Sequence, residues 1–153
     1  MGRSPVRWVA FGFGVGLLPR APGTFGTLIA IPLVVLLTFL GSWLYAIVCV
    51  VLVGIAIMVA DRVEHQLGQR DPGVIVIDEV VGFVVAMAFL PTKLWIVVIA
   101  FVIFRLLDIL KPPPIDWVER RFKGGVGIVA DDVVAGLLTN AVVQLLLLLV
   151  GLP

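Results

Sequence analysis

Charged residues are scarce in this sequence. Only 14% of its 153 residues are charged, whereas 61% are hydrophobic, and soluble domains carry about a quarter of charged residues. The net charge is +1, so the chain lacks the basic excess that marks proteins binding nucleic acid. This composition excludes water as the main solvent of the protein. It predicts an integral membrane protein in contact with the lipid bilayer.

Cysteine and histidine are almost absent as well. Cys49 is the one cysteine and lies within an apolar run, so an internal disulfide is excluded and no neighbouring charge favours its thiolate. His65 is the one histidine and lies in a polar stretch, where we expect it to be solvated. Neither residue is placed to act as a catalytic nucleophile.

Apolar runs dominate the chain. They predict an all-α, polytopic membrane helical bundle that forms a single domain over residues 1–153, with four to five apolar spans near the short end of what crosses a bilayer. The first run is short enough to be re-entrant, even if it begins at Thr24. Residues 61–73 and the stretch from Lys111 are predicted as polar loops. The predicted spans are 28–40, 43–60, 74–90, 94–110 and 133–150.

The basic residues of the predicted loops fall almost entirely on one side of the membrane. Only Lys93 falls on the other side, which is a strong positive-inside signal. Every carboxylate lies near the same face, which the positive-inside rule does not require. The basic residues assigned to the cytoplasmic side are Arg3, Arg7, Arg20, Arg62, Arg70, Lys111, Arg120, Arg121 and Lys123.

Five carboxylates from three segments gather at similar depth near this face. Packed together they would repel one another, and a divalent cation would remove that cost; carboxylate oxygens are the ligands that Mg²⁺ prefers. Adjacent acids on a helix point about 100° apart, so we expect one residue of each pair to bind the metal and the other to support it. These acids are Asp78, Glu79, Asp108, Asp131 and Asp132.

Structural explanations compete with the metal site. Asp108 is three residues from both Arg105 and Lys111, a spacing at which these charges would neutralise one another without any metal, and Asp131 and Asp132 are candidates for helix N-caps. A small transporter or an assembly subunit using the cluster to bind cations is the alternative function. A transporter predicts acids throughout the bilayer depth, but the span centres here lack charge. The spaced aspartates of CDP-alcohol phosphotransferases are also absent.

A glycine- and proline-rich stretch precedes the first span, GFGVGLLPRAPGTFGTLIAIP. This density of glycine and proline predicts a fixed, tightly turning backbone. Thr24 or Thr27 is expected to cap the first span, whose N-terminal amides would face the carboxylates and suit a phosphate. Arg20 is placed to add a positive charge.

Four ordered segments resemble the phosphatidylglycerophosphatase A family: GLLPRAPGTFGTLIAIP, VIVIDEVVGF, FVIFRLLDILKPPPIDWVERRFKGGVGI and DDVVAGL. The resemblance implies an all-helical, Mg²⁺-dependent lipid phosphatase. Its substrate would be phosphatidylglycerophosphate, whose phosphomonoester is hydrolysed to give phosphatidylglycerol and phosphate. The implied location is the cytoplasmic face of the bacterial inner membrane. The oligomeric state is left open.

The resemblance also implies roles for individual residues. The family's motif acids fall on all five carboxylates above, as catalytic residues, with Asp78, Glu79, Asp131 and Asp132 as metal ligands and Asp108 as a ligand or general base. Pro113 replaces the usual aromatic residue of the lysine–proline motif and affects only loop packing. Direct attack by water and an aspartyl-phosphate intermediate both remain open. The implied phosphate-binding positions are Arg20, Thr24, Thr27, Arg105 and Lys111.

Overall fold

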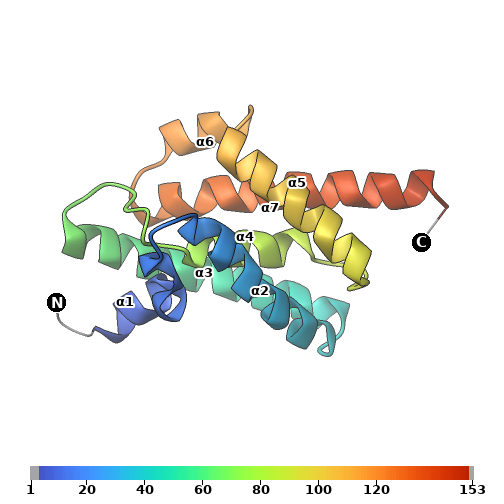
Figure 1. Ribbon diagram of the computed structural model, residues 1–153, viewed down its shortest axis with the longest axis horizontal. Coiled ribbons are helices and arrows are strands. Elements are labelled where there is room, and N and C mark those ends of the chain that lie inside the picture. Colours follow the sequence, from blue (N-terminus) through green and yellow to red (C-terminus); the bar gives the residue numbers. More distant parts are fainter. Residues whose placement is uncertain (1–3, 152–153) are drawn as a thin grey trace.

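The computed structural model describes residues 4–151, so Arg3 and the ends of the predicted domain lie outside the described residues. Every regular element between these limits is helical (Figure 1), which confirms the all-α class. The elements are α1 (Pro5–Ala10), the 3₁₀ helix η1 (Gly12–Leu17), α2 (Pro22–Thr38), α3 (Ser42–Leu67), α4 (Ile77–Ala86), α5 (Leu94–Leu110), α6 (Ile115–Arg121) and α7 (Gly124–Leu149).

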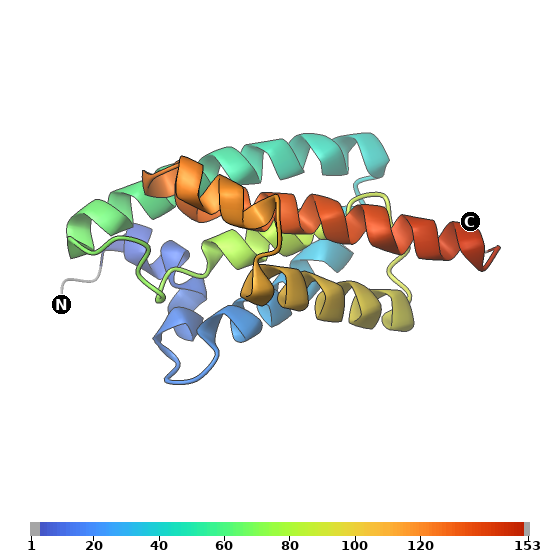
Figure 2. The same ribbon diagram turned by 90° about the horizontal axis from the view of Figure 1, so that it is seen from above.

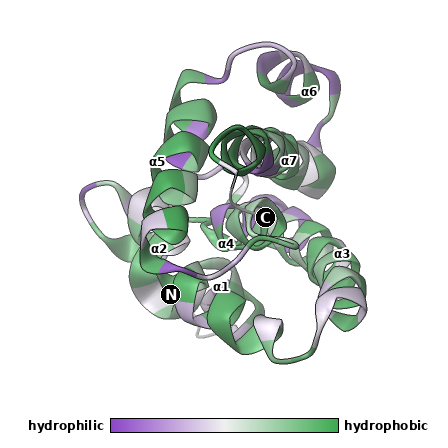
Figure 3. Ribbon diagram, turned by 90° about the vertical axis from the view of Figure 1, so that its right-hand side faces the viewer, coloured by the Kyte–Doolittle hydropathy of each residue, from purple (hydrophilic) through white to green (hydrophobic). Residues whose placement is uncertain are grey.

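The short helix α4 occupies the centre of the bundle. The longer helices α3 and α7 flank it, and α2 and α5 lie side by side along another face (Figures 2 and 3). Most side chains of α4 are buried, including Phe83, which contacts the rings of Phe101 and Phe104 on α5. A helix that is apolar on all sides is stable only when it is buried in this way.

Two glycines allow the backbones of α4 and α7 to touch. A Cβ added to Gly82 would lie 2.8 Å from the carbonyl oxygen of Asp132, and one added to Gly136 would overlap the carbonyl oxygen of Gly82. Because real Cβ atoms cannot approach that closely, larger residues would force the helices apart. This contact fixes Asp132 relative to the start of α4.

Two helices, α3 and α7, are long and apolar enough to cross a membrane, and α2 is a shorter apolar helix. Only 22% and 33% of the most apolar windows of α3 and α7 are buried, so most of their apolar side chains face outward. Figure 3 shows hydrophobic residues over most of α3, α5 and α7, while α6 is largely hydrophilic. The number of spans, and whether α2 crosses or re-enters, stay predictions.

The predicted 74–90 segment is helical only over Ile77–Ala86. At about 1.5 Å per residue this helix is about 15 Å long, roughly half the hydrocarbon thickness. Residues after Met87 turn instead, with Phe89 at a φ of 62°. Hydrophobicity alone predicted a longer helix because the turn residues are also apolar.

Both predicted loops contain helix. α3 continues through the charged residues to Leu67 and ends at Gly68, whose φ of 63° is the left-handed conformation typical of a helix C-terminus. The stretch after Lys111 includes α6. These charged segments are made of good helix formers, and hydropathy does not detect such helices outside a membrane.

The N-cap hypothesis for Asp131 and Asp132 is wrong, since α7 begins about two turns earlier at Gly124. Its first turn is capped from α3 by Asp61, whose Oδ1 accepts a hydrogen bond of 3.1 Å from the backbone N–H of Gly125. A Cβ on Gly125 would overlap the carbonyl oxygen of Ile57. A glycine at this position is therefore required for α7 to come close enough to α3 for Asp61 to cap it.

The expected cap of α2 by a threonine is also wrong. α2 begins at Pro22, and the residue before it, Ala21, has a φ of 48° and makes no side-chain cap. A proline in the first turn fits because its missing N–H would have no partner within the helix. Thr27 lies one turn inside, where its hydroxyl donates to the carbonyl of Gly23.

Candidate active site

Three carboxylates converge at the junction of α4 and α7. Asp78 and Glu79 come from the first turn of α4, and Asp132 comes from α7; oxygens of the three lie within 4.8 Å of one another. Asp78 is only 8% exposed and Asp132 only 3%. The first turn of a helix favours acidic side chains because the backbone N–H groups point toward them. The structure thus brings together three of the four predicted metal ligands.

Several oxygens of this cluster lack a hydrogen-bond partner. Among residues 4–151, Oδ1 of Asp78, Oε2 of Glu79 and Oδ1 of Asp132 are buried and unpartnered. Buried charges without partners cost several kcal/mol each. Because one oxygen of each residue lies within 4.8 Å of the others, a single divalent cation could bind all three residues, and a set made entirely of carboxylate oxygens is typical of Mg²⁺ rather than of softer metals. The residues present therefore fit a hard divalent cation.

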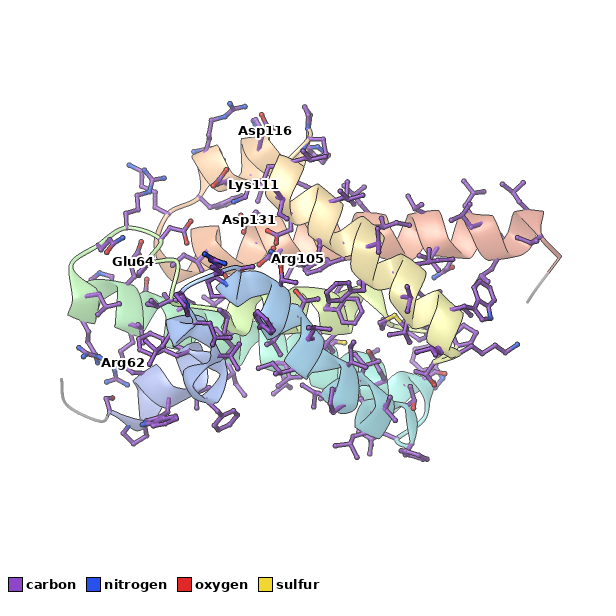
Figure 4. All side chains as sticks on the ribbon, viewed as in Figure 1. Arg62, Glu64, Arg105, Lys111, Asp116 and Asp131 are labelled. Atoms are coloured by element: carbon purple, nitrogen blue, oxygen red, sulfur yellow. The ribbon has the colours of Figure 1, made fainter. Side chains whose placement is uncertain are left out.

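Arg105 of α5 supplies the positive charge beside this cluster. Its Nη1 lies 3.9 Å from Oε1 of Glu79 and also donates to Oδ2 of Asp108. Its buried Nε–H has no partner among the described residues. Figure 4 shows Arg105 and Asp131 where α2, α5 and α7 come together. The predicted pairing of Arg105 with Asp108 is confirmed, and it leaves other guanidinium N–H groups free to bind an anion.

The start of α2 closes the site on the side opposite α7. A Cβ at Gly23 would overlap Oε1 of Glu79 and would lie 3.1 Å from Nη1 of Arg105. Only glycine allows the helix N-terminus to come this close. The backbone amides of that first turn, which includes the partly buried Thr24, therefore lie beside the guanidinium, an arrangement that suits a phosphate.

Asp131 points into a different network from Asp132. Nζ of Lys111 lies 2.7 Å from Oδ2 of Asp131 and 2.7 Å from Oε1 of Glu119. Burial alone would lower the pKa of Lys111, but the hydrogen bonds to these carboxylates raise it above its ordinary value, so the ammonium stays charged. The expected divergence of adjacent acids is thus observed for Asp131 and Asp132, and Asp131 lies outside the three-carboxylate cluster. It is not observed for Asp78 and Glu79, which both belong to the cluster.

The predicted phosphate-binding residues are placed unequally. Arg105 and the turn containing Thr24 border the carboxylates, while buried Thr27 is occupied by its bond to Gly23. Arg20 is exposed in the turn before α2 and makes no ion pair with a described residue. The ammonium of Lys111 is occupied by two carboxylates. Sequence reasoning missed Glu119, because the helix that carries it was predicted as a loop.

Replacing Lys111 with methionine should destabilise the protein more than replacing its surface partner. K111M leaves the buried carboxylate of Asp131 without a counterion, and we expect a loss of about 2 kcal/mol in the free energy of unfolding. E119Q should cost less than about 1 kcal/mol, because Glu119 is 40% exposed. Urea unfolding of both variants in detergent checks the order; equal losses would contradict the assigned network.

Sequence comparison agrees with this architecture. The pattern of the family described as Phosphatidylglycerophosphatase A matches residues 8–147. A protein named phosphatidylglycerophosphatase A from Escherichia coli K12 is 43% identical over 140 residues, which cover 91% of this chain and 81% of that protein. Its namesake from Haemophilus influenzae is 37% identical, with coverages of 92% and 87%.

A third relative carries a different name. A Bacteroides thetaiotaomicron protein, named provisionally as a phosphatidylinositol-3-phosphatase, is 40% identical over 136 residues and 84% of each chain. No solved structure shows a significant match. The match to the family pattern and the two relatives of the same name establish that this chain belongs to the phosphatidylglycerophosphatase A family and is a phosphatase.

Proposed function

We propose that this phosphatase hydrolyses the phosphomonoester of phosphatidylglycerophosphate with the help of Mg²⁺, producing phosphatidylglycerol for phospholipid synthesis. The observation that carries the metal dependence is the cluster of Asp78, Glu79 and Asp132, with its buried, unpartnered oxygens. The choice of substrate is supported by the shared name of the Escherichia coli and Haemophilus influenzae relatives.

The three carboxylates would hold the cation, and Asp131 would support them from the Lys111 network rather than bind directly. When bound, Mg²⁺ supplies Lewis acidity at the phosphoryl oxygens. Arg105 donates its free N–H groups to the non-bridging oxygens, where negative charge must be stabilised as the ester bond breaks. Asp108 accepts a hydrogen bond from Arg105 and so holds the guanidinium in place.

The start of α2 would complete the binding of the phosphate. The amides around Gly23 and Thr24 lie at the positive end of the helix dipole, which favours a doubly charged phosphomonoester over a phosphodiester. Asp108 is the remaining acid near Glu79 and Arg105, and its alternative role as general base stays a prediction.

We place the protein in the bacterial inner membrane as a multi-pass protein with this site at the cytoplasmic face. The outward-facing apolar windows of α3 and α7 support the membrane, and the loop charges support the orientation. The transporter alternative is disfavoured because the carboxylates lie at the ends of the apolar segments. An assembly subunit would have no need for unpartnered buried oxygens.

Phosphate release tests the proposal. Purified protein should release phosphate from phosphatidylglycerophosphate with Mg²⁺ and should lose at least about 99% of this activity in excess EDTA, with recovery when Mg²⁺ is restored. Phosphatidylinositol 3-phosphate belongs in the panel because of the third relative's name, and phosphatidic acid provides a further phosphomonoester. Activity unaffected by EDTA would refute the proposed metal dependence. A preference for phosphatidylinositol 3-phosphate would refute phosphatidylglycerophosphate as the substrate.

A further inference from the structure

The polar site is closed by protein on three of its flanks. Toward α3 and α7, the bond from Gly125 to Asp61 joins the two helices. Toward α5 and α7, the ammonium of Lys111 ties α6 down through Glu119 and α7 through Asp131. These contacts join the helices to one another along both flanks.

The N-terminal segment closes the third flank, between α2 and α3. The backbone N–H of Val76 donates to the carbonyl of Ala10 at 2.9 Å. A Cβ on Gly12 would lie 2.9 Å from Ile29 of α2 and 2.9 Å from Val76, and one on Gly16 would overlap the carbonyl of Val74. The segment from α1 through η1 therefore fills this side of the site.

The fourth flank, between α2 and α5, carries the more exposed members of the carboxylate–arginine site. Side-chain exposure is 13% for Arg105 and 15% for Glu79, compared with 3% for Asp132 on the far side. Figure 4 shows Arg105 at this edge of the site, between α5 and α2. A ligand that approaches Arg105 and Glu79 from this flank passes between the start of α2 and the end of α5.

An exposed apolar strip leads away from this opening. On α2, Ile29 faces η1, and Leu28 and Val35 lie about 100° and about 120° around the helix from it, on a side directed away from η1. On α5, Val98 and Val102 share a face with Arg105, seven and three residues away. All four apolar side chains are between 39% and 51% exposed.

The direction of the strip matches the shape of a lipid. α2 runs away from the site and α5 runs toward it, so Leu28 and Val102 lie about one turn, or about 5 Å, from the polar opening, and Val35 and Val98 lie deeper. An acyl chain attached to a phosphate-bearing headgroup in the site must begin at this opening. It then meets these exposed apolar side chains, whose burial is favourable by about 25 cal/mol per Å².

We propose that the strip formed by Leu28, Val35, Val98 and Val102, the α2–α5 seam, binds the acyl chains of the lipid whose phosphomonoester occupies the carboxylate–arginine site. This inference rests on the proposed function. It makes the seam the part of the enzyme that distinguishes long-chain lipid phosphates from small soluble phosphate esters with the same headgroup.

Chain-length discrimination tests the seam. We expect V98W and V35W, which fill the deep end of the seam with a larger side chain, each to lower kcat/KM for dioleoyl phosphatidylglycerophosphate roughly tenfold or more. The value for the dihexanoyl substrate should stay within about twofold of wild type, because its short chains reach little of the seam. This second substrate also reports that the variants are folded and that their polar site is intact.

V50W on α3 is the matched control, because Val50 is 74% exposed and lies on a different helix. It should leave both kcat/KM values within about twofold of wild type. Equal losses of kcat/KM on both substrates, or the same long-chain loss in V50W, would overturn the proposed role of the seam. Equal losses accompanied by an altered oligomer size would indicate that the seam binds a protein partner instead. Wild-type protein that releases no phosphate from either substrate would refute the proposed function itself.

Discussion

Asp132→Asn should abolish turnover while leaving the fold intact. We expect phosphate release to fall about a thousandfold or more, which corresponds to about 4 kcal/mol of lost transition-state stabilisation. Asp132 is buried beside Asp78 and Glu79, and an amide of the same size removes one charge from the set without creating a cavity. The initial rate at saturating Mg²⁺ is the measurement.

The stability of D132N in the absence of divalent cations distinguishes a metal-binding role of the cluster from a structural one. Neutralising one of three mutually repelling buried acids should leave the unfolding temperature unchanged or raise it when no divalent cation is present. Asp116→Asn is the control: its carboxylate pairs with Arg120 on α6, outside the site, and its activity should stay within about twofold of wild type. Strong destabilisation of cation-free D132N would instead make Asp132 a structural residue.

Gly82→Ala should cost both stability and activity. The new methyl group would lie 2.8 Å from the carbonyl oxygen of Asp132 and 2.8 Å from the ring of Phe104, so α4 and α7 must separate. We expect a loss of about 1–3 kcal/mol in the free energy of unfolding. Because Asp78 is one helical turn from Gly82, a shift of about 1 Å there should lower kcat about a hundredfold.

Gly54→Ala provides the matched comparison. Gly54 lies inside α3 and a Cβ added there meets no atom within 4 Å, so alanine should stabilise the helix by up to about 1 kcal/mol without affecting activity. Thermal unfolding and phosphate release measured on both variants give the comparison. Wild-type activity in G82A would show that the α4–α7 contact does not position the carboxylates.

The cluster of acids could be predicted from sequence because both the type of these residues and their positions along the chain indicate it. Charges are rare in this chain, so five carboxylates near the ends of apolar runs had to share a region. The helical repeat also predicted that adjacent acids would diverge, as Asp131 and Asp132 do. Hydrophobicity likewise indicated an all-helical chain, since its apolar runs are long and lack strand-like alternation.

The remaining geometry depends on contacts that no local pattern encodes. The partnership of Lys111 with Glu119 requires α6 to fold back over α7, and nothing in the spacing of these residues indicates it. The start of α7 depends on a cap from Asp61, which lies 64 residues before the Gly125 N–H that it accepts. The short length of α4 depends on a turn made of apolar residues, which hydropathy cannot separate from a helix.

The claim on which this account depends is that Asp78, Glu79 and Asp132 together hold one divalent cation. The most direct measurement is the unfolding temperature of wild-type protein and D132N, in detergent, as Mg²⁺ is titrated after treatment with EDTA. A cation that binds only the folded state must raise the unfolding temperature of the wild type with saturation, and this rise should be absent or shifted to far higher concentration in D132N. Equal responses of the two proteins to Mg²⁺ would contradict the account.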